Sequence, residues 1–376
     1  MRRTISLSRI LLCSGLLLAA GCMGSPDALA PCEPGATNRS ICSLTNPEDI
    51  GFLPGRSWLV VSEMATNDSG DEENGTPPAT GQLTAIRRPD LESRQLFPHP
   101  EGESGEATAT TGWGDPACPG PPDTSLFKPH GIDVGKRPDG RFVLAVVNHG
   151  GREAVELFEV VSQRAPRIAW RGCVPMPSGI STNDVALLPD GGFVVTNMMP
   201  AIDGVGPSAI WTMIKVSTGS DTGSVLRWAP GGEITEIENS QGSAPNGIEA
   251  SADGTEIFVA EWGGGTVYRL RLDADGAPER DEVVLEHNPD NLTWTRDGRL
   301  LVAGQHGGVG DALGCGSVRD AGCDIGYSVY LIGPVGLEAT RIIEGRGAAS
   351  VALEVGDEVY VGFFIGDQIT RVPAPD

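Results

Sequence analysis

Short runs of apolar residues alternate along most of the chain with turns rich in Gly, Asp, Asn and Pro. Beyond residue 25, the apolar positions show little of the spacing that is typical of helices. Apolar runs of this length, bounded by such turn residues, indicate many short β-strands joined by tight turns. We therefore expect an all-β protein.

One unit of this pattern recurs along the chain. Each copy has an apolar strand, a turn that contains Gly, and a second strand rich in Val, Phe or Leu. Such repeats are typical of β-propeller blades, which are short antiparallel sheets around a central channel. A β-sandwich is the alternative, but it would not require six similar units. We predict a six-bladed β-propeller over residues 43–376, with copies that begin at residues 48, 130, 183, 246, 290 and 349.

The N-terminal segment differs from the rest of the chain. A basic start precedes an apolar stretch that is too short to span a bilayer comfortably as a mature helix. Residues 1–21 resemble the signal peptide of a bacterial lipoprotein, with small residues before Cys22 as the lipid acceptor, although Ala19 stands where Leu is usual. A plain secretory signal is the alternative. We expect an exported protein, anchored to a membrane by a lipid on Cys22 and a tether over 22–42, on the periplasmic side or at the cell surface.

The charge of the chain narrows the choice of partners. The formal net charge is −23, and removal of the basic signal peptide makes it more negative. A strongly acidic protein repels phosphate, so nucleic acid is not an expected partner. The same charge is compatible with cation binding, although a solvated acidic surface explains most of it.

The cysteines fit an oxidising compartment. Six remain after Cys13 and Cys22 are set aside, and an even number outside the cytoplasm suggests disulfide bonds. No Cys-x-x-Cys pair occurs, which disfavours a zinc site. Other pairings remain open, but spacing favours Cys32–Cys42 and Cys315–Cys323, which leaves Cys118–Cys173.

Polar residues recur just before the first strand of the predicted blades. In a propeller this strand lines the channel, so these residues would lie at one mouth of it. At any single position, an Asn or Asp that bonds its own backbone in a turn is the structural alternative. Five of the six blades supply an oxygen-bearing or imidazole side chain, which favours a common ring. The residues are Glu48, Asp49, His130, Asn183, Asp184, Asn246, Asp290 and Asn291.

The predicted ring is rich in hard oxygen ligands. Glu48, Asp290 and one neighbouring acid would supply carboxylates, and Asn side chains would supply amide oxygens. Calcium takes about six to eight such oxygens in a flexible geometry, whereas magnesium prefers a tighter octahedron and zinc prefers His or Cys. Adjacent side chains on an extended strand point in opposite directions. Tandem pairs such as Glu48 with Asp49 therefore permit two calcium sites along the channel axis.

Several short motifs resemble the paraoxonase family of calcium-dependent arylesterases and lactonases. They are FKPHGIDV, VVNH followed by VELF, ND before a strand, NGI and DNLTW, and they lie between about residue 43 and residue 306. Gluconolactonase-like and strictosidine-synthase-like propellers share the metal ring but not this pair of histidines. The chain departs from the paraoxonase family in several respects, among them a loop after the second strand of the third blade that lacks the aromatic density of the family's pocket. Its C-terminal tail has no Cys for the family's terminal disulfide, and an acidic, Gly-rich insertion occupies 66–81.

The resemblance implies a role for each matching residue. A catalytic calcium ion would be held by Glu48, Asn183, Asn246, Asp290 and Asn291. A deeper, structural calcium ion would be held by Asp49, Asp184 and the backbone carbonyl of Ile132. His130 and His149 would form a pair that handles a proton.

These residues predict a calcium-dependent hydrolase of lactones or aryl esters. Calcium would polarise the carbonyl, and His130 would take a proton from the attacking water. The chain has no G-x-S-x-G motif, so water attack is favoured over an acyl-enzyme. Trp262 and Phe363 are candidates for an apolar pocket, with a place in the core as the equal alternative. The alternative is a non-catalytic propeller that is braced by calcium and binds a partner or ligand on its face, for which His130 would not be needed.

Overall fold

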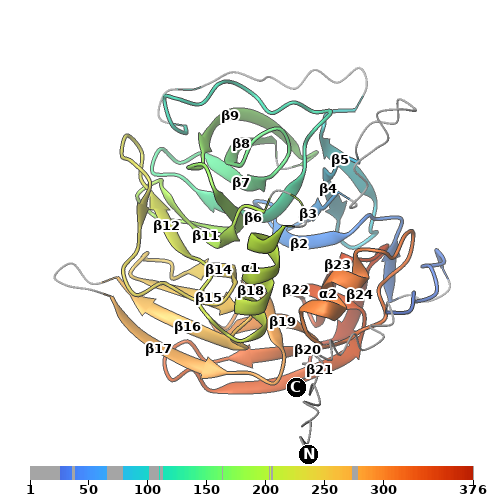
Figure 1. Cartoon of the computed structure of the whole chain (residues 1–376). Helices are drawn as coiled ribbons and strands as arrows, with labels where there is room; N and C mark the ends of the chain where they lie inside the picture. Colours follow the sequence, from blue (N-terminus) through green and yellow to red (C-terminus); the bar gives the residue numbers. More distant parts are fainter. Residues whose placement is uncertain are drawn as a thin grey trace, which may run out of the picture.

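The computed structural model shows six four-stranded antiparallel sheets arranged around a central axis (Figure 1). This confirms the predicted six-bladed β-propeller. The predicted signal peptide, with Cys22, and most of the insertion at 66–81 lie outside the described residues. No helix in the described part of the chain is long and apolar enough to cross a membrane. The structure describes residues 26–35, 39–65, 79–100, 110, 113–162, 164–202, 204, 206–272 and 278–375.

Each of the first five sheets is built from four consecutive strands, which follow the repeats read from the sequence. The first two sheets contain β2 (Pro47–Phe52), β3 (Trp58–Glu63), β4 (Gln82–Arg87) and β5 (Ser93–Phe97), then β6 (Pro129–Lys136), β7 (Phe142–Asn148), β8 (Ala154–Ser162) and β9 (Arg167–Pro175). The third contains β10 (Ile180–Leu187), β11 (Phe193–Pro200), β12 (Ser224–Trp228) and β13 (Thr235–Glu236). The fourth and fifth contain β14 (Pro245–Ala250), β15 (Glu256–Glu261), β16 (Thr266–Arg271) and β17 (Glu279–Val284), then β18 (Asn288–Trp294), β19 (Leu300–His306), β20 (Gly326–Ile332) and β21 (Ala339–Arg346).

The sixth sheet closes the ring by joining the two ends of the chain. Its order is β1-β24-β23-β22, with bounds Ser40–Cys42, Gln368–Pro373, Glu358–Ile365 and Ala348–Val355 respectively. The stretch 22–42, expected as a tether, thus contributes its last three residues to the folded ring as β1. The favoured disulfides are present, as Cys32–Cys42, Cys118–Cys173 and Cys315–Cys323.

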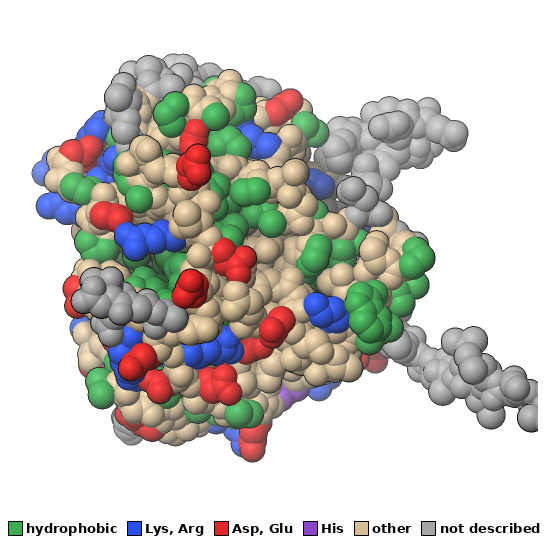
Figure 2. Space-filling model, turned by 60° about the vertical axis from the view of Figure 1, so that its left-hand side comes forward, with side chains coloured by type: hydrophobic (Ala, Val, Ile, Leu, Met, Phe, Trp, Pro, Cys, Tyr) green, Lys and Arg blue, Asp and Glu red, His purple; other side chains and the backbone are tan. Residues whose placement is uncertain are grey.

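Buried apolar side chains gather between neighbouring sheets rather than in one central core. Val60 of the first sheet and Leu144 of the second belong to one such cluster, and Ile50 and Val351 belong to another that joins the first and sixth sheets. These packed clusters fix each sheet against the next. The polar residues on the first strands, which line the channel, are therefore held in fixed positions. On the face shown in Figure 2, acidic and basic side chains lie interspersed.

Two short helices were not predicted from the apolar pattern. Helix α1 (Pro207–Ser217) follows β11 and helix α2 (Val309–Cys315) follows β19, and both lie at the same end of the channel (Figure 1). Pro207 stands at the start of α1, where a missing N–H is tolerated. Ile210 and Trp211 of α1 are exposed. The apolar residues of this helix therefore do not form the single buried stripe that marks an amphipathic helix in a sequence.

Candidate active site and cation site

The polar pairs lie inside the first strand of each sheet, at an irregularity in its pairing, rather than just before the strand. All six first strands shift register at this level. In β14, for example, the shift falls between Pro245 and Ile248 and encloses Asn246. A β-bulge disturbs the regular alternation and re-aims side chains. Six such irregularities at one level bring polar side chains together in the channel.

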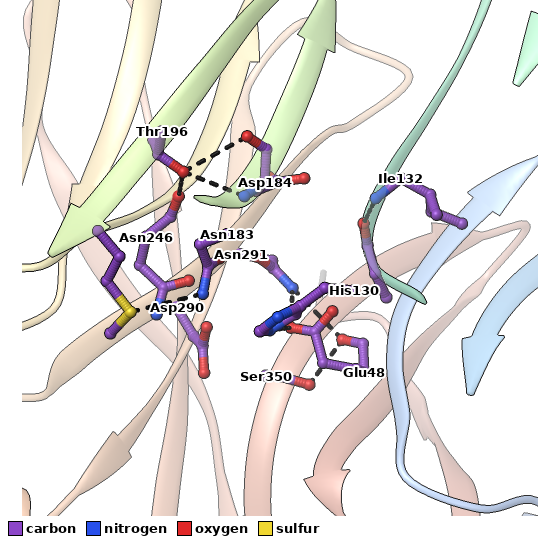
Figure 3. Close-up of polar contacts among 12 residues, drawn as sticks. Glu48, His130, Ile132, Asn183, Asp184, Thr196, Asn246, Asp290, Asn291 and Ser350 are labelled. Atoms are coloured by element: carbon purple, nitrogen blue, oxygen red, sulfur yellow. Dashed lines mark hydrogen bonds and ion pairs between the residues drawn. The ribbon is translucent and has the colours of Figure 1, made fainter. Parts of the chain in front are cut away.

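Five of these side chains, each from a different sheet, line one cavity of about 350 Å³ beside the two helices. Figure 3 shows them projecting from their strands toward a common space. A sixth, Asn291, donates its side-chain N–H to Glu48 Oε1 at 2.8 Å. The five lining residues are Glu48, His130, Asn183, Asn246 and Asp290.

Four buried oxygens in this ring have no hydrogen-bond partner, whereas most buried polar atoms in proteins have one. No group of three or more His, Cys, Asp or Glu side chains within the described ranges is arranged to hold a metal ion. Of the five lining residues, only Glu48 and Asp290 are acidic. The other oxygens are amide oxygens, which hard cations accept as ligands. The unpartnered atoms are Glu48 Oε2, Asn183 Oδ1, Asn246 Oδ1 and Asn291 Oδ1.

The electrostatics of the ring favour a cation. Burial raises the pKa of Glu48 well above its usual range, and the charges of Asp49 and Asp290 raise it further. Burial also raises the pKa of Asp290 to about 7, against a hydrogen bond from Gln305 that lowers it. A nearby positive charge would favour the ionised form of both carboxyl groups.

Asp49 and Asp184 face the other way. They line a second cavity of about 330 Å³, on the far side of the ring. Each tandem pair therefore points one side chain into each cavity. We call the cavity beside the helices the upper cavity and its polar residues the upper ring. The prediction that a neighbouring acid adds a third carboxylate to this ring is wrong. Asp49 Oδ2 accepts the N–H of Ile132 at 2.7 Å, and Asp184 Oδ2 accepts that of Ile248 at 2.9 Å. Each carboxylate thus fastens its own sheet to the next one.

The two predicted histidines are in direct contact. His130 Nδ1 lies 2.8 Å from His149 Nε2, and His130 Nε2 lies 3.6 Å from Glu48 Oε1. Burial, followed by the neighbouring His149, lowers the pKa of His130 to about 3. His130 is therefore neutral at neutral pH, and its basicity is lower than that of the unperturbed imidazole assumed from the sequence.

Sequence reasoning missed two residues that hold the ring in place. Glu153 lies beside His149, with Oε2 2.9 Å from Nδ1. Gln305 donates its side-chain N–H groups to Asp290 Oδ2 and to a backbone carbonyl, and its Oε1 accepts the indole N–H of Trp262 at 2.8 Å. Glu153 lies four residues from His149 in the same turn, whereas its other partner, Thr182, belongs to the next sheet. The contacts of Gln305 and the bond between Thr182 and Glu153 join distant parts of the chain, so no local motif could have revealed them.

The walls of the upper cavity are apolar. Trp262 lines it as expected, whereas Phe363 packs against Tyr327 in the core and the next residue, Phe364, lines the cavity instead. Helices α1 and α2 supply part of the wall. The helices contribute Met213, Val216, Val309, Ala312 and Leu313, and the remaining apolar lining comes from Met64, Met198 and Met199.

Comparison with known proteins points to the wider gluconolactonase-like class. Residues 131–312 match the family model described as SMP-30/Gluconolactonase/LRE-like region, a little under half of the chain. No curated protein matches the sequence. The finer likeness to the paraoxonase family stays a prediction.

Solved structures agree with the fold. A gluconolactonase from Xanthomonas campestris is 15% identical with a TM-score of 0.50, and the match covers 93% of this chain and 95% of that one. A luciferin-regenerating enzyme is 12% identical with a TM-score of 0.51, over 89% of this chain and 94% of that one. At such low identity the likeness establishes the six-bladed architecture alone.

Proposed function

We propose that the protein is an exported, calcium-dependent hydrolase of lactones or aryl esters. The observation that carries the proposal is the set of four unpartnered, buried oxygens beside His130 at the floor of an apolar cavity. The match of residues 131–312 to a gluconolactonase-like family model supports lactones as substrates. The apolar walls suit an alkyl or phenyl group better than a polyol, which would need hydrogen-bond partners there.

Calcium fits the donor set of the ring better than other common cations. All the proposed ligand atoms are oxygens of flexible amide and carboxylate side chains, which calcium accepts as ligands. When bound, the ion would polarise a carbonyl and stabilise the developing oxyanion. The ion would be held by Glu48, Asn183, Asn246, Asp290 and Asn291.

A second calcium ion between Asp49, Asp184 and Ile132 is also part of the proposal. Burial raises the pKa of Asp49 to about 7, and burial together with Asp49 raises that of Asp184 well above its usual range. A cation between these two buried carboxyl groups would favour their ionised forms. Their oxygens already accept backbone N–H groups, so this site has fewer free lone pairs than the upper one.

Side chains of the protein would supply the remaining parts of the reaction. His130 stays neutral and presents Nε2 toward the cavity, where it can accept a proton from water. His149 contacts the other nitrogen of His130 and holds the His130 imidazole in orientation. The apolar wall excludes bulk water and positions the organic part of the substrate.

Export and anchoring belong to the same proposal. A lipid on Cys22 would hold the propeller at a membrane through the segment that precedes β1. Mass spectrometry of the protein from membranes, with Cys22→Ser as the comparison, would test this. Unchanged mass and membrane retention in the variant would contradict it.

The function itself is tested by a hydrolysis screen. The purified protein is offered alkyl lactones, gluconolactone and phenyl esters, each with excess calcium and with excess chelator. We expect turnover of an alkyl lactone or phenyl ester that the chelator abolishes. If no lactone or ester is hydrolysed under either condition, a calcium-braced binding propeller becomes the better interpretation.

A further inference from the structure

We propose that Glu153 is a positioning residue that fixes the tautomers of both histidines and leaves His130 Nε2 free to accept a proton. The proposal rests on the proposed hydrolytic function for its purpose, but the hydrogen-bond pattern that carries it is independent of the substrate. Glu153 lies just before β8, between His149 and β10.

The carboxylate of Glu153 bonds two residues, Thr182 and His149. Thr182 of β10 donates both its backbone N–H, at 2.6 Å, and its hydroxyl to Oε1. His149 Nδ1 lies 2.9 Å from Oε2 and 3.1 Å from Oε1, so Oε2 is its nearer partner. Burial alone would raise the pKa of Glu153, but the bonds from His149 and Thr182 prevail and hold that pKa below its usual value. Glu153 is therefore an ionised acceptor, and it can only accept from His149.

This contact settles the direction of the next hydrogen bond. Because Glu153 accepts, His149 carries a proton on Nδ1. In the state with one proton on each imidazole, His149 Nε2 therefore carries a lone pair. That lone pair faces His130 Nδ1 at 2.8 Å, so His130 must donate from Nδ1. His130 Nε2 is then the unprotonated nitrogen, and His130 lines the cavity. The order of donors is His130, His149, Glu153.

Glu153→Gln is the isosteric change that reverses this order. Thr182 continues to donate to one terminal atom of residue 153, which must therefore be the amide oxygen. The amide nitrogen then takes the place of Oε2, the atom nearer to His149 Nδ1, and we expect it to donate to that nitrogen. His149 would then carry its proton on Nε2 and donate to His130, whose proton would move to Nε2 in turn. The nitrogen that faces the cavity can no longer accept a proton.

The tautomers can be measured without any substrate. Nitrogen-15 chemical shifts of histidine-labelled protein distinguish protonated from unprotonated ring nitrogens, and the chain has only five histidines. In wild-type protein with calcium, we expect protons on Nδ1 of both His130 and His149. In Glu153→Gln, we expect both protons on Nε2. Unchanged tautomers in this variant would overturn the proposal.

A matched control separates this effect from a general loss of charge. Glu159 lies on β8, has a similar exposed fraction of 17% against 23%, and is ion-paired with Arg171 away from the histidines. Glu159→Gln should leave the tautomers and the hydrolysis rate at wild-type values. A shift of the tautomers in this control equal to that in Glu153→Gln would also overturn the proposal.

Activity gives a second readout. An inverted tautomer costs about 10⁴-fold in a serine protease, and loss of a general base costs about 10²–10⁴-fold. We expect a kcat loss in that range for Glu153→Gln with KM and calcium affinity unchanged, and partial recovery in Glu153→Asp. A wild-type rate in Glu153→Gln would overturn the proposal. A wild type that hydrolyses nothing would instead refute the proposed function, and the tautomer measurement would still stand.

Discussion

His130 and Asp290 line the same cavity but have different roles in the proposed reaction, so their variants should fail differently. His130→Gln keeps a polar group and removes the base, and hydrolysis should fall by about 10²–10⁴-fold. Calcium affinity should hardly change, because a hard cation prefers oxygen to imidazole. Asp290→Ala should instead weaken calcium binding. Rate measurements and calcium titrations on both variants check this, and a wild-type rate in His130→Gln would refute the base assignment.

A third histidine predicts a dependence of stability on pH. His287 is 4% exposed, faces Ser328 Oγ, and has its pKa lowered to about 4 by burial and by His306. Between pH 4 and the unperturbed value of about 6.5, the unfolded chain binds a proton that the folded chain does not. The free energy of unfolding therefore keeps its full value above pH 6.5 and falls by about 3 kcal/mol as the pH drops toward 4.

Urea unfolding at pH 7 and pH 5, in excess calcium, measures this contribution. His287→Gln should lose less stability than wild type over that interval, because it has no imidazole to protonate. Other titrating groups are common to both proteins and cancel in the comparison. Equal losses in the two proteins would show that His287 does not carry the effect.

The residues of the ring were predictable because the repeat fixes the position of each polar residue along its blade. Asn183, Asn246 and Asp290 share one phase, and the structure brings them to one cavity. Glu153 carries no such signal, since its partner Thr182 lies 29 residues away in another sheet. The low pKa of His130 was likewise unpredictable, because it depends on burial in the folded channel.

At the scale of elements, one residue joins three sheets beneath the ring. Gln305, at the end of β19, bonds Asp290 of β18, Trp262 after β15 and the carbonyl of Ala349 in β22. The indole N–H of Trp262 donates to the amide oxygen of Gln305. The amide N–H groups of Gln305 must therefore face Asp290 and the Ala349 carbonyl. We expect Gln305→Leu to free Asp290 and weaken calcium binding about 10–100-fold, as loss of groups behind metal ligands does elsewhere.

Terbium luminescence can report this loss, because Trp262 lines the same cavity and can sensitise a lanthanide bound there. Terbium should bind Gln305→Leu more weakly than wild type, and calcium should displace it from both. A conservative Gln305→Glu variant should keep the shape but place a second carboxylate beside Asp290. An unchanged terbium affinity in Gln305→Leu would contradict the role assigned to this residue.

The strands were predictable as elements, and the helices were not. A strand bounded by Gly-containing turns leaves a strong local pattern, and the six repeats confirm each other. Helix α2 has only seven residues and α1 exposes apolar side chains, so neither leaves a periodic pattern. The bulges were also missed, because a register shift arises only when two strands pair.

At the scale of the whole molecule, a cation at the upper ring would join distant parts of the chain. Its donors come from the first, third, fourth and fifth sheets, so binding requires the closed propeller. A ligand that binds only the folded state adds about 2.7 kcal/mol at 100 times its Kd. Chelation should lower the Tm, and calcium should restore it better than magnesium. An unchanged Tm in chelator, with no calcium in the purified protein, would contradict a calcium site.

The most direct test of the account is to titrate calcium into calcium-free protein while measuring both bound calcium and turnover of the best lactone or ester. We predict that turnover rises in proportion to occupancy of the upper ring. Asn246→Ala, which removes one of the unpartnered oxygens, should shift both curves together to higher calcium. Full turnover in calcium-free protein, or an unshifted turnover curve in a variant that binds calcium more weakly, would contradict the claim that these oxygens hold the catalytic ion.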